Sequence, residues 1–495
     1  MRKIYGRILG WLLAFLLLSA GCVSEPDLPA ALPMETAEPT EGSYRAEPDP
    51  IRIVAEPQTA LSAPPTVVLS VRTKQDLAQI AVDAPQAAWF RLSAAEPGFF
   101  EAEDGLIHVS EAFRQCYGAV IPIFELPNME AAQALETFAK KNRNTDFLIA
   151  AKDASVLQSF HLTGVQKGLL LDRVTERCAG TVHAAGGDFV AISEITRAEA
   201  EYLQMRWIAV VLTPDTDTET AVKMALDVGA DQVVVRDAKE AYRLYTETAP
   251  EEVTPRRTFS VAHRGISSRA PENTLESFRE AVKAGADAVE CDVYVTKDCH
   301  LVISHNASTG AYTADGTDAN VEELTRDELK ALRLKPVGEY TDARFAFLDE
   351  FLDEMKGNDI QLVIEIKTDN PDCAVLIRSL VEERDLLDRI QIIGFSTEQI
   401  ARSRHALPEV PASLLANVGV SEPKQYLRSY YTNTADFGGA YSPSKSFTPE
   451  GVAAFRHRGI LINIWTIDGA EELQKQIQGG VTSLTTNTVY LLGQE

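Results

Sequence analysis

Strands that end in reactive side chains are the feature of this sequence that most limits its fold. The runs FSVA, ADAVECDVYV, CHLVIS and IQLVIEI are short and apolar, so each predicts a strand. The segment PENTLESFREAVKAGAD, between the first two runs, has apolar residues at helical spacing and a predicted N-cap at Asn273. Strand, helix and strand form a βαβ unit, and its repetition predicts a parallel sheet or a (β/α)8 barrel of the α/β class.

Three acids are expected to converge on one ion. Glu290 and Asp292 are two residues apart on one predicted strand, so their side chains leave the same face, and Glu365 stands on a later strand. Cys291 lies between the first two acids and should point away from the site into the packing. Carboxylates with no nearby cysteine or histidine cluster favour one divalent cation, Ca2+ or Mg2+, over Zn2+.

Two histidines and two basic residues accompany the acids. His263 and His305 are expected to move protons, and Arg264 and Lys367 to supply positive charge for phosphate oxygens. Any one of these residues alone is as readily structural, because ion pairs also occupy barrel rims. All seven residues at strand ends predict a metal-assisted site that cleaves phosphodiesters.

The stretch from about Phe259 to Glu495 resembles the glycerophosphodiester phosphodiesterase family in AHRG, PENTLESF, GADAVECDVYVTKD, the histidine of ISHN, FLDEFL, VIEIK and NIWTID. The resemblance implies a metal-dependent TIM barrel that hydrolyses a small glycerophosphodiester to sn-glycerol 3-phosphate and an alcohol. It also implies the roles of the site residues: His263 and His305 as general acid and base, Glu290, Asp292 and Glu365 as metal ligands, and Arg264 and Lys367 as the family's basic pair.

Three further residues are weaker pocket candidates. Trp465 stands on a predicted strand, where an aromatic ring is more often core, but the resemblance implies a place in the substrate pocket. Glu272 is also a family position, although an acid before a helix also complements the helix dipole. Tyr441 in GAYSPS is the weakest of the three candidates.

Two acids of the family pattern are replaced by amides. The sequence has His305-Asn306 where the family usually has His-Asp, and Thr486-Asn487 where it has Thr-Asp. Neither change removes a predicted metal ligand or a histidine. We therefore expect catalysis to be kept and substrate choice to be altered.

Length and charge bound the remaining possibilities. A chain of 495 residues with 45% hydrophobic residues is long enough for two packed domains. The formal net charge of -25 argues against nucleic acid as a partner and against a basic membrane-binding surface.

The N-terminus is typical of a bacterial lipoprotein signal. MRKIYGR is basic, ILGWLLAFLLL is apolar, and small residues precede Cys22. We predict a signal peptide at 1–21, lipidation of Cys22, and an extracytoplasmic protein anchored to the cell membrane; an ordinary signal peptide or an uncleaved anchor are the alternatives. The segment 22–65 is proline-rich and predicts a disordered tether.

Between the tether and a linker at 249–257, the segment 66–248 repeats patterns of the catalytic domain at 258–495. AVIPIFELPN parallels IQLVIEIKTD, which sets Glu125 against Glu365. We predict a shorter, degenerate TIM-barrel-like copy, because Trp89 and Arg91 then replace the first two acids. The alternative is that any two βα repeats look alike. Since eight units typically need about 200 residues, we expect an abbreviated or partly open barrel.

The predicted function is therefore metal-dependent hydrolysis of glycerophosphodiesters by a membrane-anchored lipoprotein. One alternative is a phospholipase-type lyase that forms a cyclic phosphate. The other is a non-catalytic envelope lipoprotein that binds polymer or protein. The predicted role of the N-terminal copy is to pack against the active domain or to bind a lipid headgroup or wall polymer.

Overall fold

The computed structural model describes residues 65–117, 119–248, 256–416, 427–428, 430–431, 440–443 and 447–491. The predicted signal peptide, Cys22, nearly all of the predicted tether and most of the predicted linker lie outside the described residues. From residue 65 onward, the described chain belongs to one compact unit.

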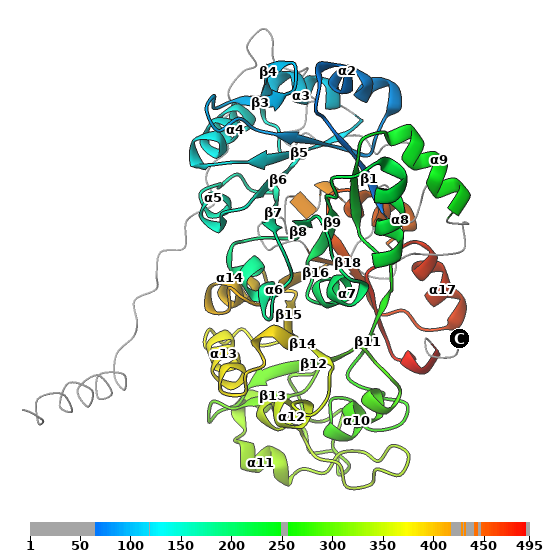
Figure 1. Ribbon diagram of the computed structural model, residues 1–495. Coiled ribbons are helices and arrows are strands. Elements are labelled where there is room, and N and C mark those ends of the chain that lie inside the picture. Colours follow the sequence, from blue (N-terminus) through cyan, green and yellow to red (C-terminus); the bar gives the residue numbers. More distant parts are fainter. Residues whose placement is uncertain are drawn as a thin grey trace, which may run out of the picture. The chain divides into compact units, whose positions relative to one another are not determined.

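The segment 66–248 forms a complete barrel (Figure 1). Strand β1 pairs with both β2 and β10, which closes the ring, so the expectation of a partly open barrel was wrong, whereas the expectation of a shorter barrel is confirmed. Eight units fit because the strands have only four to six residues and two of the helices only five and seven. The strands are β1 (Thr66–Ser70), β2 (Ala87–Arg91), β5 (Ile121–Leu126), β6 (Leu148–Ala151), β7 (Gln166–Leu171), β8 (Phe189–Ile192), β9 (Ala209–Leu212) and β10 (Gln232–Val235).

Helices surround this barrel, and a hairpin follows β2. The hairpin consists of β3 (Phe99–Ala102) and β4 (Gly105–His108). The helices are α2 (Lys74–Asp83), α3 (Val109–Cys116), α4 (Met129–Asn142), α5 (Ala154–Gln158), α6 (Cys178–Ala184), α7 (Arg197–Met205), α8 (Thr218–Val228) and α9 (Ala238–Thr248).

The second barrel also closes, because β11 pairs with both β12 and β19. Its parallel strands are β11 (Phe259–Ala262), β12 (Ala288–Val295), β14 (Gln361–Ile366), β15 (Ile390–Gly394), β16 (Ala412–Ala416), β17 (Ala440–Pro443), β18 (Leu461–Ile464) and β19 (Ser483–Thr486). Strand β13 (Leu301–Ile303) is antiparallel to the end of β12 and lies outside the ring. The structure therefore has the predicted fold class, a TIM barrel preceded by a second barrel.

The helices of the second barrel follow the same alternation with its strands. They are α10 (Leu275–Lys283), α11 (Arg326–Ala331), α12 (Leu348–Met355), α13 (Cys373–Glu383), α14 (Thr397–Ala406), α16 (Pro449–Arg456) and α17 (Ala470–Gln478), with 3-10 turns at Val321–Glu323, Leu387–Arg389 and Val489–Leu491.

Alternation along β12 separates core from site. Cys291 and Val293 belong to the apolar layer between the strands and helices such as α10 and α12. Glu290 and Asp292 therefore face the barrel interior, because successive side chains of a strand point to opposite sides. Val261, Val363 and other small apolar side chains fill the interior below them.

The two barrels meet through the N-terminal ends of their strands. Asp146, just before β6, accepts two hydrogen bonds from Arg458, which precedes β18, at 2.7 and 2.8 Å. Gln232 at the start of β10 donates to the carbonyl of His457 at 3.1 Å. A buried ion pair joins Asp231 to Arg256. We call the end of each barrel where its strands begin the floor, and the end where they finish the mouth. Since the two floors are in contact, the two mouths face away from each other.

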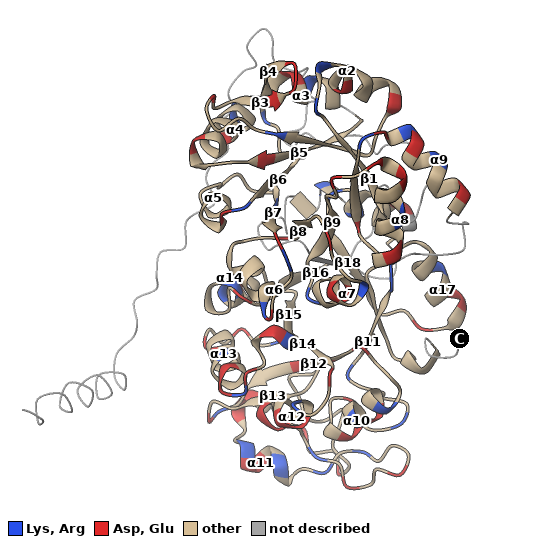
Figure 2. Cartoon of the chain, in the orientation of Figure 1, with Lys and Arg blue, Asp and Glu red and all other residues tan. Residues whose placement is uncertain are grey.

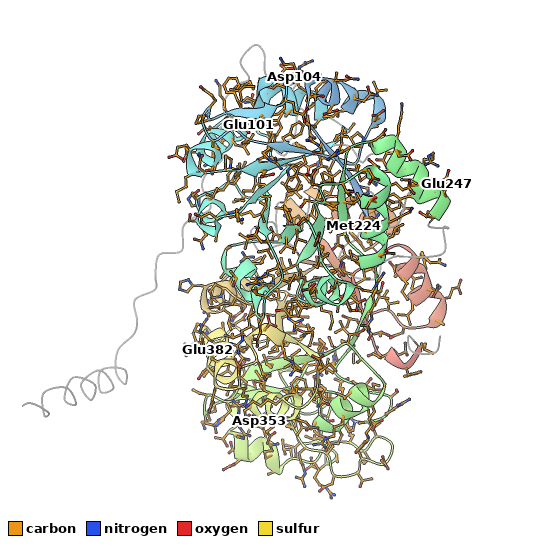
Figure 3. All side chains as sticks on the ribbon, viewed as in Figure 1. Glu101, Asp104, Met224, Glu247, Asp353 and Glu382 are labelled. Atoms are coloured by element: carbon orange, nitrogen blue, oxygen red, sulfur yellow. The ribbon has the colours of Figure 1, made fainter. Side chains whose placement is uncertain are left out.

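Charged residues are spread over the helices that cover the barrels (Figure 2). Glu247 on α9, Asp353 on α12 and Glu382 on α13 are examples, and their side chains lie on the outside (Figure 3). Within the residues that the structure describes, no helix combines the length and the apolar character needed to cross a membrane.

Candidate active site

A left-handed turn after β11 begins the site. Arg264 has φ 55° and Gly265 has φ 79°. A Cβ atom at Gly265 would lie 2.5 Å from Ser277 Oγ, so glycine is needed for this close approach to α10. The turn directs the backbone N–H of Arg264 to Glu290 Oε2 at 2.9 Å. It therefore places His263 at the strand end and anchors the first acid at the same time.

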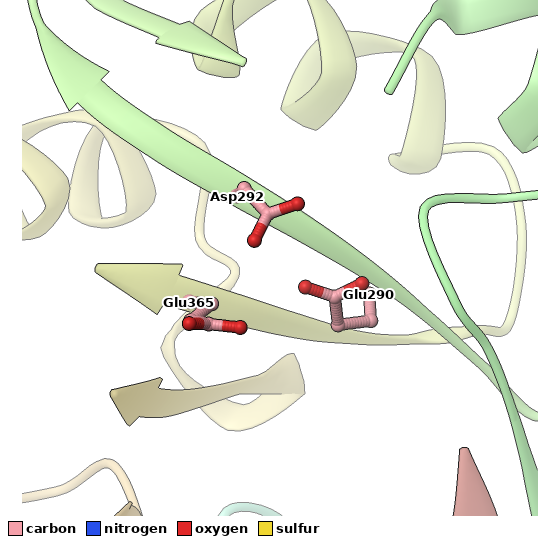
Figure 4. Close-up of side chains that lie close together, drawn as sticks. All are labelled: Glu290, Asp292 and Glu365. Atoms are coloured by element: carbon pink, nitrogen blue, oxygen red, sulfur yellow. The ribbon is translucent and has the colours of Figure 1, made fainter. Parts of the chain in front are cut away.

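The three predicted metal ligands converge. Asp292 on β12 stands directly opposite Glu365 on β14, and Glu290 lies two residues earlier on the same face (Figure 4). One carboxylate oxygen from each acid lies within 4.8 Å of the others. The three residues are 2%, 0% and 8% exposed. Within the described part of the chain, this is the only such group of acids, histidines or cysteines.

The electrostatics of the triplet favour a cation. Burial, followed by repulsion from Asp292 and Glu365, raises the pKa of Glu290 well above its ordinary value. Burial and then Asp292 raise the pKa of Glu365 to about 7. Glu290 Oε1 accepts no hydrogen bond from any described residue, and Asp292 Oδ1 and Glu365 Oε1 both face the ammonium group of Lys367. These buried oxygens are hard ligands of the kind that Ca2+ and Mg2+ prefer, so the residues fit a divalent ion.

The two predicted phosphate-binding residues, Lys367 and Arg264, form ion pairs with these acids. Lys367 Nζ lies 2.5 Å from Glu365 Oε1 and 3.3 Å from Asp292 Oδ1. Although burial lowers the pKa of Lys367, the attraction of the two acids outweighs it and the pKa is raised. Arg264 Nη1 donates to Glu272 at 3.1 Å, and its Nε lies 3.4 Å from Asp292 Oδ2. Glu272 is thus brought beside the predicted site as an orienting partner of Arg264.

His263 is held by a chain of two residues. Its Nδ1 lies 3.0 Å from Asn487 Oδ1. Asn487 donates from its backbone N–H and its Nδ2 to the carboxylate of Asp468, at 2.8 and 2.9 Å. Because the amide nitrogen of Asn487 donates its hydrogen bond to Asp468, the amide oxygen must face the imidazole ring. Nδ1 of His263 therefore carries the proton in the neutral ring, and Nε2 is the acceptor.

His305 follows the antiparallel strand β13 rather than a strand of the barrel. Its Nδ1 lies 3.0 Å from Asn306 Oδ1, and Tyr312 Oη accepts from the backbone N–H of Asn306 at 3.0 Å. Burial is the largest cause that lowers the pKa of both histidines. The two amides that replace family acids thus stand at the Nδ1 atoms of the two histidines.

Asn273 has a different role from the predicted one. The N-cap of α10 is Thr274, whose side chain accepts from Ser277 N, so the prediction of an Asn273 cap was wrong. Asn273 has φ 57°, and its Nδ2 donates to Asp292 Oδ2 at 2.8 Å. Threonine next to asparagine was the available signal, since either caps a helix and only one is needed. Sequence reasoning also did not identify Asp468 and Tyr312.

An aromatic wall stands beside Lys367. The partly exposed Trp465 contacts Phe395 edge to face, with 5.6 Å between ring centroids. Phe395 is 48% exposed, and Lys367 Nζ lies 5.8 Å from its ring centroid. Trp465 therefore lies next to the charged cluster, whereas Tyr441 is described only as part of the backbone of β17.

The N-terminal barrel has a different set of side chains at the matching register. Arg91 pairs with Glu125 across β2 and β5, as Asp292 pairs with Glu365 across β12 and β14. Trp89 precedes Arg91 by two residues, as Glu290 precedes Asp292. Ser70 pairs with Trp89 and so takes the place of His263. One acid of three and neither histidine is present at these positions.

Part of this chain is similar to known proteins. Residues 263–491 match the model of the Glycerophosphoryl diester phosphodiesterase family. A glycerophosphodiester phosphodiesterase of Caldanaerobacter subterraneus is 28% identical over 239 residues, covering 47% of this chain and 94% of the relative. A probable glycerophosphodiester phosphodiesterase 1 of Mycobacterium tuberculosis is 29% identical over 268 residues, 48% of this chain and 93% of the relative. A solved structure from Silicibacter pomeroyi matches 49% of this chain and 96% of its own, with 22% identity and a TM-score of 0.43.

Proposed function

The C-terminal barrel of this chain belongs to the glycerophosphoryl diester phosphodiesterase family, and from that premise we propose that the protein hydrolyses glycerophosphodiesters with the help of a divalent cation. The products are sn-glycerol 3-phosphate and an alcohol. The observation that carries the proposal is the buried triplet of Glu290, Asp292 and Glu365, which offer one oxygen each within 4.8 Å of one another.

The acids and the basic residues of the site have different proposed roles. Glu290, Asp292 and Glu365 hold the ion, and a bound Ca2+ or Mg2+ supplies positive charge for the phosphoryl oxygens. Arg264 and Lys367 add fixed donors for the same oxygens, because each reaches the rim of the triplet.

The two histidines move the protons through Nε2, since an amide oxygen faces Nδ1 of each ring. One histidine takes the proton of the attacking water and the other protonates the leaving alkoxide oxygen. The proton balance closes because one ring gains a proton while the other loses one. At the start of a turnover, one of His263 and His305 must therefore be an imidazolium with a second proton on Nε2, and the other a neutral ring with Nε2 free to accept.

The test uses the full chain with glycerophosphocholine, glycerophosphoethanolamine and glycerophosphoglycerol, in Ca2+, Mg2+ or chelator. We expect metal-dependent release of glycerol 3-phosphate that His263→Ala and Glu290→Gln abolish. His405→Ala removes an exposed histidine on α14 and is the matched control. Absence of turnover on every diester, with the metal bound, would show that the proposal is wrong. Release of a cyclic phosphate would favour the lyase instead.

We also propose that the protein is an extracytoplasmic lipoprotein anchored to the cell membrane through Cys22. The support is the basic, apolar and small-residue order that precedes this cysteine, followed by the proline-rich 22–65. Metabolic labelling with a fatty-acid analogue should label the protein and lose the label in Cys22→Ala. Cys299→Ala changes an exposed free cysteine and is the control. Equal labelling of both variants would contradict the anchor.

A further inference from the structure

The mouth of the N-terminal barrel contains a cavity of about 530 Å3 at the C-terminal ends of its strands. It opens at the place where the other barrel has its candidate active site. The lining residues that matter most are Ser70, Arg72, Trp89, Arg91, Glu125 and Arg236.

A guanidinium group occupies the central position of this mouth. Arg91 stands at the register of the metal-binding Asp292, and Glu125 at that of Glu365. Glu125 Oε2 accepts from Trp89 Nε1 at 2.9 Å and from Arg91 Nε at 3.2 Å. Glu125, the one acid that is kept, therefore binds the guanidinium group of Arg91. In the catalytic barrel, the acids at the matching positions are proposed to bind a metal ion. Arg91 uses its Nε in this contact, and its side chain is 69% exposed.

Two further arginines stand on the rim with acids that are easily displaced. Arg72 pairs with Glu103 at 3.1 Å, and the acid side chain is 64% exposed. Arg236 pairs with Asp215 at 2.7 Å, and that acid side chain is 92% exposed. Exposed pairs of this kind contribute little free energy, so a ligand exchanges for the acid at low cost. Glu125, with a side chain that is 22% exposed, stays in place as the anchor.

We propose that this mouth binds a small phosphate-bearing anion without a metal ion and without cleaving it. Guanidinium groups present paired donors that match phosphate oxygens, and three of them surround one cavity. Hydrolysis is excluded by the same register, since Trp89 and Ser70 replace Glu290 and His263. The remaining acid of the lining, Glu101, is exposed (Figure 3).

The shared ligand chemistry is a phosphate group on a small organic body. A phosphodiester would make the mouth a store of substrate, and a phosphomonoester would make it a sensor of product. The inference does not rest on the proposed function, because it concerns a separate mouth and needs no turnover.

The test is calorimetric titration of the full chain, in chelator, with inorganic phosphate, sn-glycerol 3-phosphate and glycerophosphocholine. We expect saturable binding of at least one organic phosphate. Arg91→Gln should weaken it about tenfold or more, because it removes a charged hydrogen-bond donor. Arg236→Gln tests the rim separately and keeps the test decisive if Arg91→Gln fails to fold. Tighter binding of the monoester or of the diester identifies the source of the phosphate.

Two variants act as controls. Arg243→Gln removes an arginine on α9 that pairs with Glu240 and Glu247 outside the mouth, and binding should not change. Glu290→Gln alters the other barrel, and binding should again persist. The proposal is overturned if no phosphate compound binds in chelator, if both mouth variants bind normally, or if binding is lost in Glu290→Gln.

Discussion

The two barrel mouths share a strand register, but they place different charges at the same positions. In the C-terminal mouth, Asp292 and Glu365 face each other as like charges, whereas Arg91 and Glu125 form an ion pair in the N-terminal mouth. Both barrels close with the same order of strands all the same. Barrel closure therefore depends on the apolar pattern of strands and helices, and the chemistry depends on a few side chains at the strand ends.

The two mouths also differ in how their acids are partnered. Burial and like charge raise the pKa of Glu290 well above its ordinary value, and Glu290 Oε1 accepts no hydrogen bond from the described residues. In the N-terminal mouth, Glu125 accepts from both Trp89 and Arg91. The C-terminal mouth therefore keeps one buried acid oxygen without a partner among the described residues, whereas the acid of the N-terminal mouth is paired.

The largest expected effect comes from making the catalytic mouth resemble the other one. Asp292→Arg introduces the residue found at the same register of the N-terminal barrel. It removes a proposed metal ligand and puts a positive charge in its place, so we expect kcat to fall by about a thousandfold or more, which corresponds to several kcal/mol of transition-state stabilisation. Steady-state assays on a glycerophosphodiester measure the loss.

The control for this variant is Asp227→Arg, which makes the same change on the exposed side of α8. It should keep both kcat and the melting temperature. Substantial turnover by Asp292→Arg would mean that the acids are part of the scaffold, and the contrast between the mouths would lose its meaning.

At the floors of the barrels, unlike at the mouths, charged side chains of one barrel are paired with those of the other. Arg458 and Asp146 have side chains 0% and 2% exposed, and the pair is bidentate. Tyr431 Oη also donates to Asp146 at 2.8 Å. Gly459, with φ 69°, follows this arginine, and a Cβ atom there would approach Leu148 to 3.7 Å. The N-terminal barrel therefore covers the floor of the catalytic barrel as a packed neighbour.

Arg458→Met should destabilise the protein by about 3–5 kcal/mol, because it leaves a buried carboxylate without its cation. Urea unfolding followed by circular dichroism measures the change. The double variant Arg458→Met with Asp146→Leu should recover most of the stability, since an apolar pair removes the unpaired charge. A change below about 1 kcal/mol in the single variant would mean that the barrels are stable independently of this contact.

Local periodicity explains how much the sequence could predict. The spacing of Glu290 and Asp292 set both acids on one face, and the position of Glu365 at the end of an apolar run set it on a neighbouring strand. The structure brings these three together. The same reasoning matched Arg91 to Asp292, and the register of the two barrels agrees.

What the sequence could not predict depends on contacts between distant residues or on unusual backbone. Arg458 and Asp146 are 312 residues apart, and no local pattern joins them. Asn273 reaches Asp292 only because its own φ is 57°, a conformation that the sequence PENT does not require. The N-terminal barrel closed in fewer residues than expected because α5 and α6 are short.

Metal binding should change the free energy of unfolding through the C-terminal mouth and leave the N-terminal mouth without effect. This change is expected to be smaller than that in Arg458→Met. In chelator the triplet repels itself, so adding Ca2+ or Mg2+ should raise the free energy of unfolding by about 2.7 kcal/mol at a hundredfold excess over Kd. Glu365→Gln should lose this increment, because it removes a ligand. Its counterpart Glu125→Gln should keep it. Thermal unfolding with and without metal measures both, and an equal loss in the two variants would contradict a metal site confined to the C-terminal mouth.

The smallest expected effect concerns the residue that orients a histidine. Asp468→Ala frees the amide of Asn487 to turn and present its nitrogen to His263 Nδ1, which favours the wrong tautomer. We expect kcat to fall by roughly tenfold to a hundredfold with KM unchanged. Asp468→Asn should recover part of the rate, since its Oδ1 still accepts one of the two hydrogen bonds.

The nitrogen chemical shifts of the His263 ring distinguish this role from a merely structural one. They should report a proton on Nδ1 in the native chain and a mixture of tautomers in Asp468→Ala. Serine takes the place of this histidine in the N-terminal barrel, and Arg236 follows β10 as Asn487 follows β19, so the orienting chain has no counterpart there. A native tautomer in a slow Asp468→Ala enzyme would assign the loss to the loop after β18 rather than to the imidazole.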